Sequence, residues 1–195
     1  MGQYYHLVIL NDHKKTYPNK KKVNSWLYSH EFDNGSKLME FSYIDNHFVG
    51  TFEELINKEH GKFAGYPVIC AGDYADDEPY KLNGEKMNIY SLCDDYGKEI
   101  KKDDAPKPKH YRYIINETKG LFFDTDRVKE DKDGYKIHPL PLLIADGNGR
   151  GGGDYEGKNE RMIGSWKRNV VVTSDNRPDE AKYREVFYNF RETYY

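Results

Sequence analysis

Several segments of the chain carry the alternation of hydrophobic and polar positions that is typical of β-strands. The first is QYYHLVIL, residues 3–10, which is aromatic and β-branched in character and ends at a turn-forming Asn11-Asp12 pair. From there onward we expect further strands over residues 25–29, 66–72, 87–93, 110–116, 120–125, 135–145, 169–174 and 183–192.

One stretch, residues 45–61, has the period of a helix instead. Its hydrophobic positions recur at i, i+1, i+4, i+7 and i+8, which places them along one face. These positions are Phe48, Val49, Phe52, Leu55 and Ile56. The spacing predicts the main helix, beginning at Asp45 or Thr51 and stopped by Gly61, with its apolar face on the sheet. A short first helix is expected over residues 38–43.

Turn residues at 116–120 and 131–134 separate successive predicted strands, as in antiparallel hairpins. The segment 97–109 is charged and contains two prolines, which is typical of a flexible surface loop. We therefore predict one α+β domain spanning residues 1–195. It should hold a largely antiparallel twisted sheet, one main amphipathic helix and glycine-rich loops.

Charge and composition exclude some functions. The 30 basic and 33 acidic residues give a net charge of -3, which offers no general attraction to nucleic acid or to anionic lipid. No apolar run approaches a membrane span and no basic segment precedes the first one, so we expect a cytoplasmic protein without a membrane partner. Cys70 and Cys93 are expected to be reduced, buried thiols. The 18 tyrosines suit a binding surface.

Six glycines fall within residues 144–157, and Gly147, Gly149 and Gly152 match G-x-G-x-x-G. A dinucleotide site would need a helix directly afterwards, and the following residues are poor helix formers. The loop is therefore interpreted either as a structural crossover or as an anion-binding loop with Arg150 as its forked donor. The candidate binding residues here are Asp146, Asn148, Arg150, Asp154 and Tyr155.

A second segment, residues 70–79, repeats the sequence Gly-Asp-Tyr at Asp73 and Tyr74, which become further candidate binding residues. We predict that Asp73 and Asp154 lie in one cleft or on one sheet edge. Asp73, Asp76 and Asp77 could together hold Mg²⁺ or Ca²⁺, although a solvated acidic turn without a cofactor is the alternative interpretation. The seven histidines show no H-x-x-x-H spacing, and no nucleophile has a recognisable setting, so we lean against an enzyme.

Five motifs together resemble a family of uncharacterised proteins from bacteria, their phages and mobile elements, with more distant relatives in fungi. They are MGQYY at the start, LME at 38–40, ICAGDYAD at 69–76, HPLPLL at 138–143 and ADGNGRGGGDY at 145–155. Because these proteins are uncharacterised, the resemblance assigns no catalytic activity to any residue of this chain. Its phage association implies a protein that acts on a host system.

The leading hypothesis is thus a phage-type or mobile-element binding protein, of the anti-defence kind, that captures a host protein in the host cytoplasm. A small anionic ligand is a second kind of partner, and nucleic acid is disfavoured. One alternative function is a metal-assisted nuclease or nucleotide hydrolase using Asp73, Asp76 and Asp77. Another is a protein that sequesters a nucleotide signal through Arg150.

Overall fold

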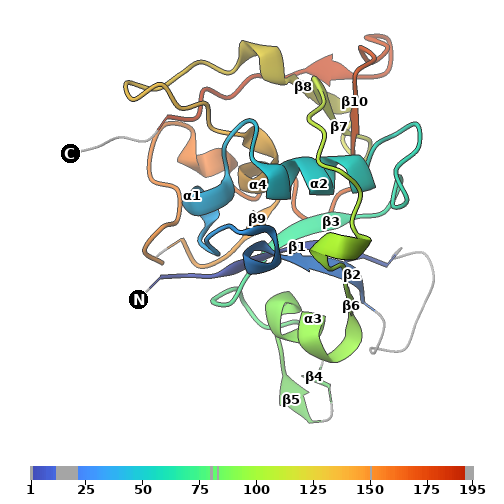
Figure 1. Cartoon of the computed structure of the whole chain (residues 1–195), viewed down its shortest axis with the longest axis vertical. Helices are drawn as coiled ribbons and strands as arrows, with labels where there is room; N and C mark the ends of the chain where they lie inside the picture. Colours follow the sequence, from blue (N-terminus) through green and yellow to red (C-terminus); the bar gives the residue numbers. More distant parts are fainter. Residues whose placement is uncertain (1, 12–21, 80, 83, 150, 192–195) are drawn as a thin grey trace.

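Two β-sheets enclose a layer of helices in the computed structural model, which describes residues 2–11, 22–79, 81–82, 84–149 and 151–191 (Figure 1). The five-stranded sheet has the order β6-β2-β1-β3-β9. Its strands are β1 (Tyr5–Leu10), β2 (Val23–Tyr28), β3 (Val68–Gly72), β6 (Lys98–Glu99) and β9 (Ala145–Asp146).

The four-stranded sheet has the order β10-β7-β8-β11. Its strands are β7 (Tyr113–Asn116), β8 (Leu121–Asp124), β10 (Val171–Ser174) and β11 (Arg184–Glu185), and a separate small hairpin joins β4 (Lys81–Leu82) to β5 (Glu85–Lys86). The α+β class is as predicted, but both larger sheets are mixed. The pairs β2·β6, β3·β9 and β8·β11 run parallel, because short strands return from long connections instead of from hairpins.

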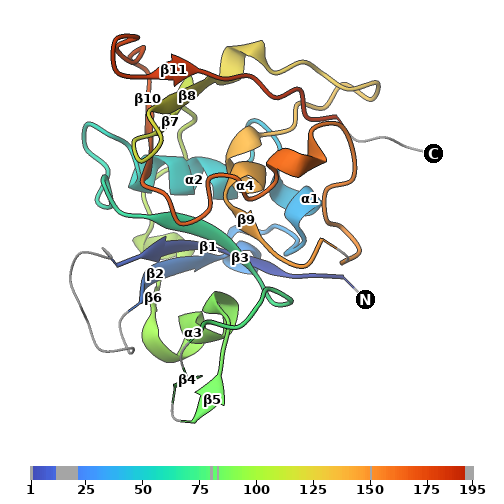
Figure 2. The same cartoon turned by 180° about the vertical axis from the view of Figure 1, so that it is seen from behind.

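Three helices, α1 (Leu38–Phe41), α2 (His47–Leu55) and α4 (Pro139–Leu143), lie between the two sheets, and α3 (Ile89–Tyr96) covers the outer face of the five-stranded sheet (Figures 1 and 2). Strand β1 is consequently buried on both faces. Leu7 and Ile9 belong to the main core with α2 and α4, whereas Val8 and Leu10 pack with α3 in a second core. Cys70 and Cys93 are free and buried, as expected.

Helix α2 forms where the hydrophobic spacing predicts it. Its N-cap is Asn46, whose side chain accepts hydrogen bonds from the backbone of Phe48 and Val49. Phe48, Val49 and Phe52 are fully buried, so the predicted apolar face does pack in the core. The helix ends at Leu55, ahead of the expected Gly61 stop.

Two segments predicted as strands are helices. In residues 87–93, the Asn88 side chain caps α3 by accepting the Ser91 N–H (2.9 Å), and the buried positions Ile89, Leu92 and Cys93 have helical spacing. In residues 135–145, His138 caps α4 and Pro139 occupies its first turn, where proline is well tolerated. Both helices were hidden by aromatic and aliphatic composition that also suits strands.

Two other predictions differ in extent. In the predicted strand 183–192, of which residues 183–191 are described, the strand is limited to β11. The charged segment 97–109 contains β6 and a 3₁₀ turn, Lys102–Asp104, and crosses beside α2 with the Lys109 N–H donating to the Gly50 carbonyl (3.2 Å).

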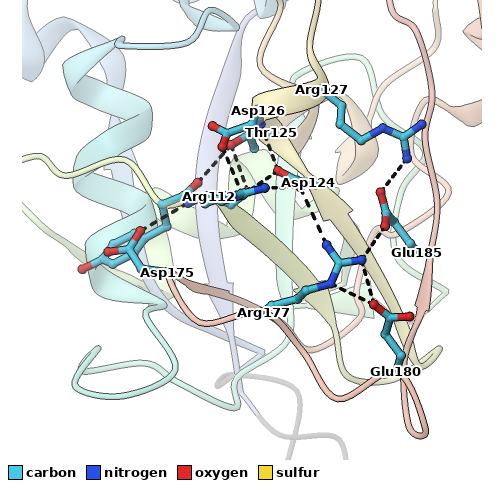
Figure 3. A network of polar contacts seen from close by, with 10 residues as sticks. Arg112, Asp124, Thr125, Asp126, Arg127, Asp175, Arg177, Glu180 and Glu185 are labelled. Atoms are coloured by element: carbon cyan, nitrogen blue, oxygen red, sulfur yellow. Dashed lines mark hydrogen bonds and ion pairs between the residues drawn. The ribbon is translucent and has the colours of Figure 1, made fainter.

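A polar network covers the outer face of the four-stranded sheet (Figure 3). At its centre the buried Asp124 accepts two hydrogen bonds from Arg112 (3.1 and 3.0 Å). Arg177 reaches Glu180 (2.8 Å) and Glu185 (3.0 Å), and its guanidinium packs over Phe122. The network thereby joins the segment after β10 to β8 and β11.

Candidate functional site

The two Gly-Asp-Tyr segments meet at one end of the five-stranded sheet. Strands β3 and β9 are parallel neighbours, so the loops that follow them leave the sheet at the same edge, where β1 begins (Figures 1 and 2). We call the described residues of 3–5, 72–74 and 146–155 the Gly-Asp-Tyr edge. Asp73 and Asp154 therefore do lie on one sheet edge, on either side of the first strand.

Gln3 connects the two segments. With its amide oriented so that both ends are paired, its nitrogen donates to Asp154 Oδ2 (3.0 Å) and Asn148 Oδ1 (3.3 Å), and its oxygen accepts the Tyr74 N–H (3.2 Å). Asp73 completes the connection, because its carboxylate accepts the Tyr4 N–H (3.0 Å) and its own N–H donates to the Tyr4 carbonyl (2.9 Å). The edge is thus fixed by side chains that pair with backbone.

Both carboxylate oxygens of Asp154 accept hydrogen bonds from neighbouring residues. Its Oδ1 accepts the Tyr5 hydroxyl (2.7 Å) and its Oδ2 accepts the Gly151 N–H (2.9 Å). Burial, together with the hydrogen bond and charge of Asp154, raises the pKa of the Tyr5 hydroxyl well above its usual value. Tyr5 therefore remains a neutral donor, and this pair is structural.

Close packing explains several of the glycines. A Cβ atom added to Gly72 or Gly147 would lie 2.4 or 2.5 Å from the side chains of Gln3 or Tyr5, and one added to Gly151 would lie 2.2 Å from the Gln3 Cβ. Side chains at these positions would displace the first strand. The glycine loop thus has a structural role: it lets the chain pass directly against β1.

The other predicted loop residues are also engaged. Asp146 pairs with Lys167 (2.8 Å) and Arg168 (3.5 Å). Tyr155 is buried, and its hydroxyl donates to the Lys158 carbonyl (2.6 Å) while accepting the Arg191 N–H (2.8 Å). Arg150, the proposed anion donor, lies outside the described residues.

A pocket of about 250 Å³ opens beside the loop. The charged side chains around it are Asp146, Asp154, Glu160 and Lys167, of which Lys167 is already paired with Asp146. Three carboxylates against one engaged cation repel an anion. The described part of this pocket therefore does not favour a small anionic ligand.

The predicted acidic metal site is not assembled. In the described part of the chain, Glu53, His110 and His138 are the one group of three metal-ligating residues whose ligand atoms come close enough to share an ion. Asp73 instead uses its carboxylate to hold the first strand, while Asp76 and Asp77 are exposed.

Glu53, His110 and His138, here called the Glu53 cluster, come from α2, from the segment before β7 and from the start of α4. Glu53 and His138 are buried, and the His110 side chain is 25% exposed. Glu53 Oε2 lies 2.6 Å from His110 Nδ1 and 3.3 Å from His138 Nε2. His138 Nδ1 accepts the Leu140 N–H (3.2 Å), so its proton is on Nε2 and faces the carboxylate.

Electrostatics in the Glu53 cluster favour a charged pair. Burial alone would raise the pKa of Glu53, but the two histidines outweigh it and hold that pKa below its usual value. Burial alone would lower the pKa of His110, yet Glu53 holds it above the usual range. The sequence offered one signal for this cluster: a glutamate on the apolar face of α2, next to Phe52 and one turn after Val49.

A larger pocket, of about 570 Å³, lies beside the end of α2 and is lined in part by Glu54, His60 and Lys62. His60 Nε2 lies 2.8 Å from Glu54, which also accepts the hydroxyl of Tyr111. Its lining contains both acidic side chains (Glu54, Glu99 and Asp104) and basic ones (Lys62 and Lys98), so its charge favours no single ligand class.

Comparison with known proteins gives no further guide, since no family model matches the chain and neither a curated protein nor a solved structure resembles it. Among the described residues, no helix has both the length and the apolar character needed to cross a membrane.

Proposed function

We propose that this chain is a binding protein that captures a protein partner through the Gly-Asp-Tyr edge. In keeping with the phage-type resemblance of its motifs, the proposed partner is a component of a host system, such as a defence protein, in the host cytoplasm.

One observation carries the proposal. Tyr4 and Tyr74 are 45% and 38% exposed, and their backbone N–H groups donate to the side chains of Asp73 and Gln3, which hold the two segments side by side. Among the described residues, the large hydrophobic side chains exposed to this degree are Tyr4, Tyr74 and Tyr135. Tyrosine is among the residues that are enriched in protein interfaces and that often dominate their binding energy.

The charge beside these tyrosines indicates the kind of partner. Asp76 and Asp77, which follow Tyr74 after Ala75, are exposed. An acidic rim attracts a basic surface and accelerates association at low salt. The proposed partner therefore presents lysine or arginine around an apolar recess.

The alternatives receive less support. The hydrolase hypothesis needs a metal bound by Asp73, Asp76 and Asp77, whose carboxylates serve other contacts or face solvent. The nucleotide hypothesis depends on Arg150 beside a pocket whose described charges are mainly acidic.

The test is affinity capture from host cells with the tagged wild type and the double variant Tyr4→Ser, Tyr74→Ser. We expect the wild type to retain a specific partner and the double variant to lose at least about tenfold in affinity, the size expected for two interface anchors. Raising the salt concentration should weaken the wild-type complex.

Tyr135→Ser is the matched control, because it removes a tyrosine that is even more exposed (59%) from a different segment, between β8 and α4. Melting curves of all three proteins should agree, since these side chains lie at the surface. If Tyr135→Ser abolishes capture and the double variant does not, the edge is not the binding surface. Absence of any specific partner in cells carrying the host system would contradict the proposed function itself.

A further inference from the structure

A buried glutamate between two imidazoles is an unusual feature of a protein core, because ionised carboxylates are rarely found there without strong partners. Glu53 projects from α2 and meets side chains from two segments that are distant in sequence. Its ligand oxygen and the facing nitrogens of His110 and His138 all lie within 4.8 Å of one another. Two imidazole nitrogens and one carboxylate oxygen are the ligands that transition metals of the zinc class prefer.

We propose that the Glu53 cluster binds one divalent transition-metal ion, with zinc as the best match. This inference is independent of the proposed partner-binding surface, which uses other residues at the edge of the five-stranded sheet.

The separations fit such an ion after a small adjustment. Bonds of 2.0–2.1 Å in a tetrahedral site place ligand atoms about 3.3 Å apart. His138 Nε2 already lies 3.3 Å from Glu53 Oε2, whereas His110 Nδ1, at 2.6 Å, must move outward by about 0.7 Å. His110 is the partly exposed member of the cluster, so it has room to move toward solvent.

The surroundings of His110 also provide access. Its ring packs over Gly50 of α2, where an added Cβ would approach both the Cε1 and Nε2 atoms at 3.0 Å. The absence of a side chain at Gly50 lets the imidazole lie against the helix. Because His110 reaches the surface, the fourth coordination position can be taken by water from that side.

Metal binding must displace protons at two nitrogens. The His110 nitrogen that faces Glu53 must lose its proton to solvent, and His138 must move its proton from Nε2 to Nδ1. The second change turns His138 Nδ1 from an acceptor into a donor, so the Leu140 N–H loses the hydrogen bond that it makes in the cap. One lost cap is small compared with three metal–ligand bonds, so the exchange favours the ion.

The test titrates the metal-free full chain with ZnCl₂ and follows binding by calorimetry and the melting temperature. We expect one equivalent to bind and the melting temperature to rise with zinc concentration. His110→Asn should weaken binding at least 100-fold. His47→Asn is the matched control, since it removes an exposed histidine from α2, the helix that carries Glu53.

Two spectroscopic measurements do not depend on the variant folding. X-ray absorption of the wild-type zinc complex should show two imidazoles in the first shell, and nitrogen NMR should show the His138 proton moving from Nε2 to Nδ1. Zinc that binds without imidazole ligands, or equally well to His110→Asn, would overturn the proposal, as would no binding to the wild type. Tyr4→Ser, Tyr74→Ser should bind zinc like the wild type, which separates this site from partner capture.

Discussion

His6 lies in the middle of the sheet and is 3% exposed, with its ring stacked on Tyr90 at 4.0 Å and beside Trp26 at 4.4 Å. Within the described residues its Nδ1 has no hydrogen-bond partner. Burial among these rings lowers the pKa of His6 from 6.5 to about 3. The folded protein therefore keeps this imidazole neutral well below the pH at which the unfolded chain would protonate it.

This difference predicts acid sensitivity with a defined sign. Since the folded pKa is the lower one, the unfolded state takes up the proton first, and stability falls as pH decreases from about 6.5 toward 3. The loss should reach about 3 kcal/mol at pH 4. His6→Phe, which retains a stacked ring, should lack this component when urea unfolding is compared at pH 7 and pH 4. His47→Phe, at an exposed position, should behave as the wild type, and parallel pH curves for all three proteins would refute the prediction.

Helix α2 packs between the two sheets, and its Phe52 is fully buried in the main core. Phe52→Ala should lower the free energy of unfolding by about 3–5 kcal/mol, because it leaves a cavity between the sheets. Chemical denaturation measures this loss, and His47→Ala on the exposed side of the same helix should change stability by less than about 1 kcal/mol. Equal effects of the two substitutions would mean that the helix does not pack as described.

The elements also show how far the sequence could predict the fold. Helix α2 was predictable because five apolar positions repeat over two turns, and β1, β7 and β8 because their strands end at clear turns. Helices α3 and α4 were not, because each is short and its type is decided by one capping side chain, Asn88 or His138. Local composition does not reveal which polar residue will cap.

The candidate site was likewise predictable from the sequence only in part. The meeting of Asp73 and Asp154 was predicted from a repeated tripeptide, but the roles of Gln3 and Tyr5 between them were not, because these residues resemble ordinary strand residues. The Glu53 cluster depends on contacts between segments that are distant in sequence, which spacing rules for metal ligands do not detect.

Arg168 connects two segments of the molecule that are distant in sequence. It donates to Glu78 (2.5 Å), in the loop after β3, and to Asp146 (3.5 Å) at the end of β9. Burial alone would raise the pKa of Glu78, but its hydrogen bonds with Arg168 and Lys22 hold it below the usual value. The stabilisation is therefore present above about pH 4.5 and is lost as pH falls further.

Arg168→Met should remove this connection and leave Glu78, 3% exposed, with one basic partner fewer. Breaking a buried ion pair typically costs about 3–5 kcal/mol. Arg177→Met is the comparison, because the Arg177 side chain is more exposed (44% against 28% for Arg168), so we expect a smaller loss although it makes more ion pairs in the network of Figure 3. Urea denaturation of both variants measures the difference, and a larger loss for Arg177→Met would contradict it.

The passage of the glycine loop against Gln3 and Tyr5 has a consequence for biosynthesis. The first strand emerges from the ribosome well before the segment that completes its edge, because Tyr5 and Asp154 are 149 residues apart in the sequence. Until then the Tyr5 hydroxyl lacks the carboxylate that accepts its hydrogen bond, and β3 lacks its parallel neighbour. Contacts of such long sequence separation form slowly. The nascent chain should therefore remain without its completed Gly-Asp-Tyr edge until residues 146–155 have been synthesised.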